Sequence, residues 1–208
     1  MLVLPASGSL NLGGATLSIP SGANVTLLGA DTTMDAEGRS RHFDVHGVLL
    51  LSGVALVRGY ASTDASPGAT EPGRGGSLLI SRGGHAVVQD CSITHSAAAL
   101  QDGAISVLGA LDMARSSIRN SSVQTGINGA IGLSGSAAFI DCVMSELLAV
   151  QSGAIGVGSF TGPPGLLSLI RCAIANSTAK IIDPNFPAVR RWPTHAITSC
   201  PAPMQMLL

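Results

Sequence analysis

Aromatic and charged residues are scarce in this sequence, and their scarcity excludes several classes of protein. Only 3% of the residues are aromatic and 11% are charged, against a usual charged share of about a quarter. The 11 basic and 12 acidic residues are scattered and leave a net charge of −1. A chain without a cluster of Lys and Arg is not expected to bind nucleic acid.

Long apolar runs are also missing. The longest, residues 48–57, is about half of the ~20 residues that a membrane-spanning helix needs, and it contains Ser52 and Gly53. We therefore expect no transmembrane segment in this chain. Residues 1–14 lack the basic start and the apolar run of a signal peptide, which favours a segment of a longer protein.

Metal-binding cysteine patterns are absent as well. The four cysteines, Cys91, Cys142, Cys172 and Cys200, form no CxxC pair and have no histidine at zinc-ligand spacing. We expect no metal and no cofactor, and the redox compartment stays open. Buried free thiols are favoured over a disulfide between Cys142 and Cys172, because directly stacked residues seldom reach the disulfide torsion.

What the sequence does contain is a repeat of about 25 residues, a period typical of stacked-repeat proteins. Gly-Ala-Ile occurs at 103–105, 129–131 and 153–155. Four units align, and they share a glycine column: Gly76, Gly103, Gly129 and Gly153. We expect the glycine to supply backbone freedom at a corner, the alanine to fit a narrow position and the isoleucine to begin an inward strand.

Two further columns fall into register without having been used to make the alignment. One holds Cys91, Ser116, Cys142 and Cys172, and the other holds Ile93, Ile118, Met144 and Ile174. A spacing of two places both columns on the same face of a strand. Residues 52–56 fit the same frame, with Val54 in the cysteine column and Leu56 in the isoleucine column.

These patterns predict an all-β fold, a single right-handed parallel β-helix of six to eight turns over residues 1–182. Each unit holds two or three short strands, and no amphipathic helical window intervenes. Residues 62–74 are rich in Pro, Gly, Ser and Thr and are predicted to be a loop excursion from one corner. Residues 183–208 contain five prolines. We expect them to form a tail or an irregular cap, with end-to-end self-association where the last turn is uncovered.

A family resemblance rests on the same motifs. The repeated Gly-Ala-Ile, with Gly-Gly-Ser-Leu at 75–78 as its first instance, is accompanied by Ile-x-x-Ser at 93–96, 118–121 and 174–177. The combination resembles the GGA(I/L/V) and FxxN repeats of the chlamydial polymorphic outer membrane proteins and of the wider pectin-lyase-like, right-handed β-helix families. The resemblance implies a surface-displayed, adhesin-like solenoid without chemistry of its own.

The residue before the cysteine column alternates in charge: Asp90, Arg115, Asp141 and Arg171. On an outward face these side chains would stack at the ~4.8 Å strand spacing, which predicts an ion-pair ladder that fixes register. The alternative is an inverting glycosidase pair, Asp90 and Asp141, about 9.5 Å apart. Arg115 between them would keep both carboxylates ionised, which argues against an acid role for either.

Other polar residues give weaker signals. His42 and His46 lie four residues apart on one predicted strand face with Asp44 between them, a pattern that a metal site could use, but no fourth ligand is apparent and we favour solvated strand residues. Sugar-binding grooves usually present aromatic platforms, and the only Trp and Tyr are Trp192 in the tail and Tyr60 at a turn.

The sequence therefore favours a non-catalytic cell-surface or extracellular solenoid that binds a glycan or a surface protein. The alternative function is a carbohydrate-active enzyme, either a polysaccharide lyase or a glycoside hydrolase of the pectin-lyase-like fold, acting through Asp90 and Asp141.

Overall fold

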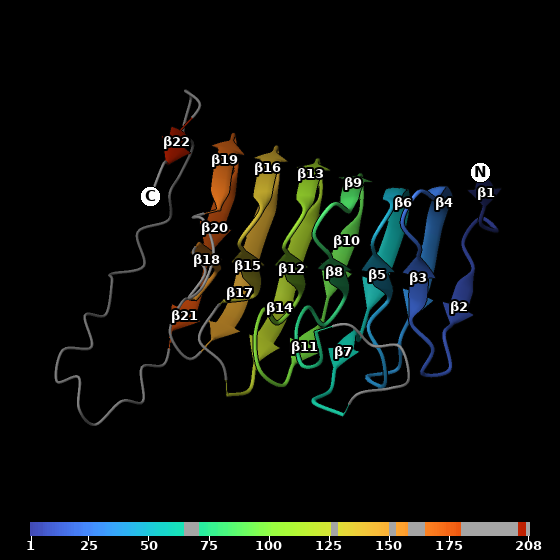
Figure 1. Ribbon diagram of the computed structural model, residues 1–208, viewed down its shortest axis with the longest axis horizontal. Coiled ribbons are helices and arrows are strands. Elements are labelled where there is room, and N and C mark those ends of the chain that lie inside the picture. The colour runs from blue at the N-terminus through green and yellow to red at the C-terminus, as the bar shows by residue number, and fades with distance from the viewer. Residues whose placement is uncertain (65–70, 126–128, 150–152, 158–164, 180–203, 207–208) are drawn as a thin grey trace, which may run out of the picture.

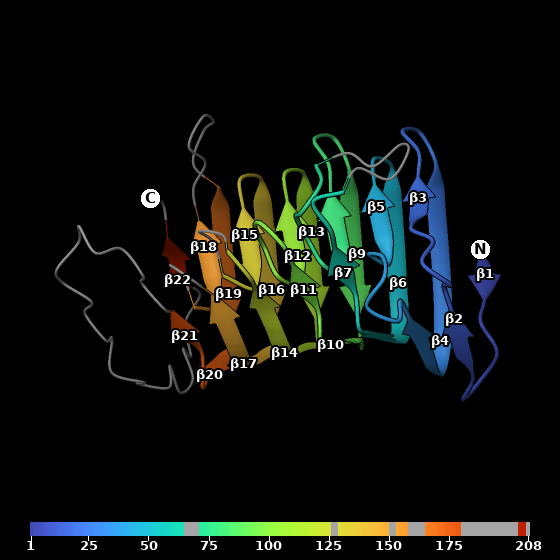
Figure 2. The same cartoon turned by 90° about the horizontal axis from the view of Figure 1, so that it is seen from below.

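The chain is a parallel β-solenoid of about six turns, as the repeat predicted (Figure 1). The structure is a computed structural model that describes residues 1–64, 71–125, 129–149, 153–157, 165–179 and 204–206. Within these ranges all regular elements are strands. Figures 1 and 2 show the turns stacked side by side along the long axis, with three strand-bearing faces.

The three faces are formed by corresponding strands of successive turns. The first face holds β1 (Leu2–Val3), the starts of β4 (Asn24–Asp35) and β6 (Val48–Val57), β9 (His85–Gln89), β13 (Ala110–Ala114), β16 (Ser136–Ile140) and β19 (Leu166–Ile170). The second holds β2 (Ser9–Asn11), the ends of β4 and β6, β10 (Ser92–Thr94), β14 (Ser117–Val123), β17 (Val143–Ala149) and β20 (Ala173–Ala175). The third holds β3 (Leu17–Ile19), β5 (Phe43–Val45), β8 (Leu78–Ile80), β12 (Ile105–Val107), β15 (Ile131–Leu133) and β18 (Ile155–Val157).

Short strands continue the second face beyond its corner. They are β7 (Tyr60–Ala61), β11 (Ala97–Ala98) and β21 (Thr178–Ala179). Each of these short strands pairs in parallel with a strand of a neighbouring turn. The exception in the sheets is β22 (Met204–Met206), which pairs antiparallel with β19.

The strand register reproduces the isoleucine column of the sequence. Ile93 pairs with Ile118, Ile118 with Met144, and Met144 with Ile174. Leu56 pairs with Ile93, so the turn at residues 52–56 also stands in the predicted frame. Ile93, Ile118 and Met144 are completely buried, and the core consists mainly of such aliphatic columns.

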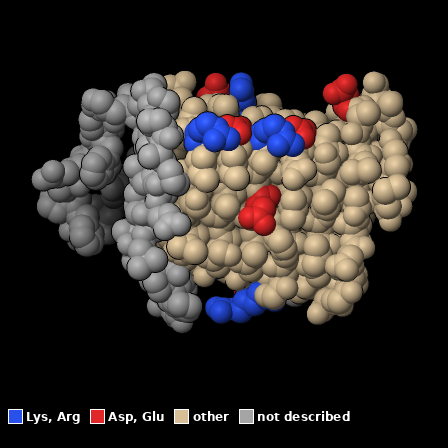
Figure 3. Space-filling view, turned by 90° about the horizontal axis from the view of Figure 1, so that it is seen from above, with Lys and Arg blue, Asp and Glu red and all other residues tan. Residues whose placement is uncertain are grey.

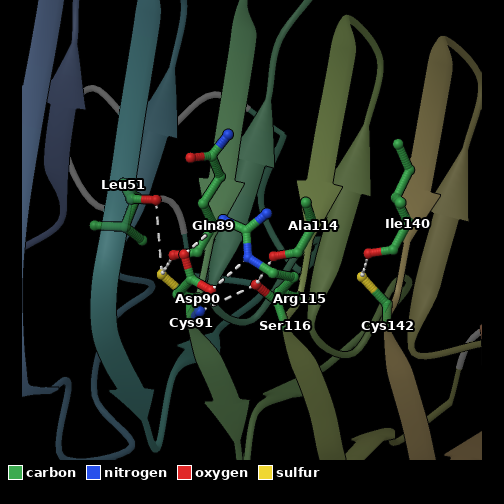
Figure 4. Close-up of polar contacts among 9 residues, drawn as sticks. All are labelled: Leu51, Gln89, Asp90, Cys91, Ala114, Arg115, Ser116, Ile140 and Cys142. Atoms are coloured by element: carbon green, nitrogen blue, oxygen red, sulfur yellow. Dashed lines mark hydrogen bonds and ion pairs between the residues drawn. The ribbon is translucent and has the colours of Figure 1, made fainter.

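The corner between the first and second faces is made by one residue in the left-handed conformation. Asp90, Arg115, Asp141 and Arg171 occupy it, with φ between 47° and 54°. The next residue is buried in each turn and donates a side-chain hydrogen bond to the carbonyl two residues before it (Figure 4). Cys91 Sγ lies 3.0 Å from Gln89 O, and Ser116 Oγ lies 2.7 Å from Ala114 O. The cysteine column is therefore a set of small buried donors that satisfy corner carbonyls.

A second corner repeats this arrangement after the isoleucine column. Asn120 and Asn176 have φ of 49° and 50°. Ser121 Oγ then donates to Arg119 O at 3.1 Å, and Ser177 Oγ donates to Ala175 O at the same distance. At 118–121 the Ile-x-x-Ser motif thus encodes a buried isoleucine, a left-handed corner and a hydroxyl that closes it. At 93–96 the Ser96 hydroxyl instead shares a hydrogen bond of 2.6 Å with Ser77 Oγ.

At Gly76 and Gly103 close packing requires the glycine and backbone freedom does not, so the predicted reason was wrong for these two positions. Gly76 and Gly103 are not among the residues with positive φ. A Cβ on Gly76 would lie 2.3 Å from Ala97 O, and one on Gly103 would lie 2.4 Å from Ser122 O. The other two motif positions are as predicted, since Ala104 and Ala130 are fully buried and Ile105 and Ile131 begin inward strands.

This packing predicts an unequal response of two glycines to alanine. Gly103→Ala should lower the free energy of unfolding by about 3 kcal/mol, because backbone atoms must move to admit the methyl group. Gly22 has a φ of 80° but nothing within 4 Å of its Cβ position, so Gly22→Ala should cost only about 1 kcal/mol. Urea denaturation of both variants measures the difference, and equal losses would contradict the close-packing explanation.

Candidate functional site

A shallow groove of about 630 Å³ runs along the corner between the first and second faces. Asp31, Asp90, Arg115 and Asp141 contribute its charged groups, and Ser92 and Ser117 contribute hydroxyls. Figure 3 shows basic and acidic side chains in contact near one edge of a face that carries only a few other, separate charged side chains.

The charges of this corner form closed pairs in which each arginine reaches back to the aspartate of the preceding turn. Arg115 donates from Nε to Asp90 Oδ1 at 2.8 Å and from Nη2 to Oδ2 at 2.7 Å (Figure 4). Arg171 makes the same two bonds to Asp141, at 2.6 and 2.7 Å. Such bidentate geometry is the strong form of an arginine–carboxylate contact.

This pairing decides the ionisation of the two aspartates proposed for catalysis. The hydrogen bonds from Arg115 hold the pKa of Asp90 below its usual value. Those from Arg171 do the same for the pKa of Asp141, on which Arg115 acts only through its charge. An inverting glycosidase needs one carboxyl group that is protonated, and both groups here are stabilised as carboxylates.

A similar pair at the second corner was not predicted. Arg58 has a φ of 56° and donates from Nε to Asp35 Oδ1 at 3.0 Å, with a second contact between Nη2 and Oδ2. The pair depends on the strand register, which places Asp35 beside Val57, the residue before Arg58.

The cysteine column is part of the buried core. Cys91, Cys142 and Cys172 are buried free thiols, as predicted. Burial raises the pKa of Cys91, and hydrogen bonding with the Cys172 thiol together with burial raises the pKa of Cys142. Cys200 lies outside the described residues.

His42 and His46 do not lie on one exposed strand face as predicted. His42 is fully buried, and its Nε2 lies 2.9 Å from Met34 O. Asp44 lies with His46, whose Nε2 is 3.1 Å from Asp44 Oδ1. His42 lies before the start of β5, so the inward–outward alternation of strand side chains does not extend to it. It occupies the narrow corner position that Ala104 occupies in a later turn. Within the described residues no three His, Cys, Asp or Glu side chains are grouped to hold a metal ion.

A second cavity, of about 460 Å³, lies beside the described parts of the loop 62–74, and we call it the excursion pocket. Its walls include Ser18, Arg39, Arg41, Asp44, Tyr60 and Asp64. Arg41 and Asp44 are 6% and 5% exposed, and Arg41 Nη1 lies 3.9 Å from Asp44 Oδ2. Arg41 also donates from Nη2 to Glu71 O at 3.0 Å, which connects the pocket wall to the loop.

Sequence reasoning missed this pocket, although two of its signals were visible. The composition of residues 62–74 predicts an excursion, and Tyr60 is the only tyrosine of the sequence. The loop and Tyr60 lie beside Arg41 and Ser18 only because of the strand register across three successive turns.

Comparison with known proteins identifies no relative. The chain matches no protein family, no curated protein and no solved structure. Among the described residues, no helix has the length and apolar character needed to cross a membrane.

Proposed function

We propose that this chain is a non-catalytic β-solenoid that binds a partner through its surface. The observation that carries the proposal is the state of the two corner aspartates. Asp90 and Asp141 each accept two hydrogen bonds from an arginine of the next turn. Their carboxylates are therefore engaged in holding neighbouring turns together. A groove lined by such closed pairs offers polar contacts to a ligand without a general acid.

A carbohydrate-active enzyme is the second candidate, because one groove contains both Asp90 and Asp141. The purified chain should be incubated with acidic and neutral polysaccharides, and both binding and release of reducing or unsaturated ends should be measured. We expect binding without turnover. Turnover that is lost in Asp141→Asn and retained in Ser136→Asn, a substitution at an exposed position of the first face, would overturn the proposal in favour of the enzyme.

The proposal also includes a cell-surface or extracellular location and contact with a second copy of the solenoid. A low content of charge and a surface of stacked strands suit a cell-surface or extracellular module of a longer protein. End-to-end contact between solenoids is proposed for the terminal turns, where sheet edges offer backbone groups for pairing. At one end the first-face edge strand β19 is paired with β22, which would restrict this contact.

A further inference from the structure

We propose that the excursion pocket binds a single neutral saccharide residue. This inference rests on the proposed binding function and adds to it a place and a ligand class. The volume of about 460 Å³ lies inside the range of about 300–1,000 Å³ that small-molecule sites occupy. It is also the place where the loop excursion meets the body of the solenoid.

The charges of the pocket walls are balanced. Arg39 and Arg41 face it together with Asp44 and Asp64. A negatively charged sugar acid would be attracted by the two arginines but repelled by the two carboxylates. A positively charged amino sugar would be attracted by the carboxylates but repelled by the arginines. Neutral hydroxyl groups can accept from a guanidinium and donate to a carboxylate at the same time. The lining therefore favours a ligand rich in hydroxyls and without net charge.

The central polar groups are held in place by the protein. The Arg41 guanidinium donates to Glu71 O at 3.0 Å. The Asp44 carboxylate lies 3.9 Å from Arg41 Nη1 and 3.1 Å from His46 Nε2. Both side chains are more than nine-tenths buried. Groups positioned in this way lose little conformational freedom when a ligand arrives, which increases affinity.

Tyr60 gives the pocket an aromatic wall. Its backbone N–H donates to Ser40 O at 2.8 Å, and Ser40 Oγ donates to Ala15 O at 3.0 Å, so the residue is tied to the two preceding turns. A tyrosine ring combines an apolar face with a polar tip. The C–H face of a sugar ring can pack on such a surface while its hydroxyls reach the charged groups.

An NMR titration of the uniformly labelled full chain tests the inference. Methyl glucoside, methyl galactoside and methyl mannoside are the neutral probes, with glucuronic acid and glucosamine as charged probes. We expect saturable shifts of the Tyr60 and Ser18 amides with at least one neutral probe, and about tenfold weaker binding of both charged probes.

Two variants locate the binding. Ser18 is an exposed strand residue on the pocket wall, so Ser18→Phe should fill the pocket and abolish binding without disturbing the core. Ser136→Phe, on the first face, should leave binding unchanged. Neutral binding that survives Ser18→Phe, tighter binding of a charged probe, or no saturable binding would overturn the inference. The first two of these results would leave the proposed binding function intact, and cleavage of a polysaccharide would instead overturn that function.

Discussion

Ile118→Asp should abolish folding of the solenoid. Ile118 is fully buried and pairs with Ile93 on one side and Met144 on the other, so a carboxylate there would enter an aliphatic column that offers it no counter-charge. We expect a loss of more than about 4 kcal/mol in the free energy of unfolding, a large part of the stability of a typical domain.

Ser117→Asp is the matched control, because the neighbouring side chain points to the corner groove. That variant should keep the strand-rich circular dichroism spectrum and cooperative urea unfolding of the parent chain, whereas Ile118→Asp should lose both. If both variants fold equally well, the inward column has been assigned to the wrong face.

Acid should destabilise the protein through His42 before it affects the paired aspartates. Burial lowers the pKa of His42 from 6.5 to about 4, so between these values the unfolded chain takes up a proton that the folded chain does not. Stability is therefore full above pH 6.5 and falls as the pH drops towards 4. The expected loss is about 3 kcal/mol. The aspartates with lowered pKa values, Asp35, Asp90 and Asp141, contribute only as the pH falls through and below their ordinary range.

His42→Gln keeps a neutral side chain that can donate to Met34 O and removes the titration. Urea unfolding of this variant at a series of pH values between 7 and about 4 should show little slope, even if its stability at neutral pH is reduced. His95→Asn changes an exposed corner histidine and should retain the slope of the parent chain. A slope that persists in His42→Gln would assign the acid sensitivity to another group.

The repeat architecture could be predicted because the buried columns are regular. Ile93, Ile118 and Met144 occupy equivalent positions in turns of nearly equal length, and sequence alignment therefore coincides with strand register. The reason for the glycines could not be predicted in the same way. Both a left-handed corner and a close backbone contact select glycine, and only the position of Ser122 O beside Gly103 distinguishes them.

The two candidate sites also differ in how much of them the sequence could predict. The corner position of Asp90 and Asp141 follows from their place before the buried cysteine column. The direction of pairing does not follow, because an arginine between two aspartates can bind either one. The excursion pocket combines Ser18, Arg41 and Tyr60 from three turns, and no local motif connects them.

The alternating corner charges have a consequence for how such a chain can change in length. Loss of the one turn that holds β13–β15 would bring Asp90 next to Asp141 and set two carboxylates against each other. Loss of two turns, β13–β18, would bring Arg171 next to Asp90 and recreate a closed pair. The corner thus follows an odd–even rule: whole turns are gained or lost at least cost in twos, and an unpaired duplication leaves a charge mismatch at its boundary.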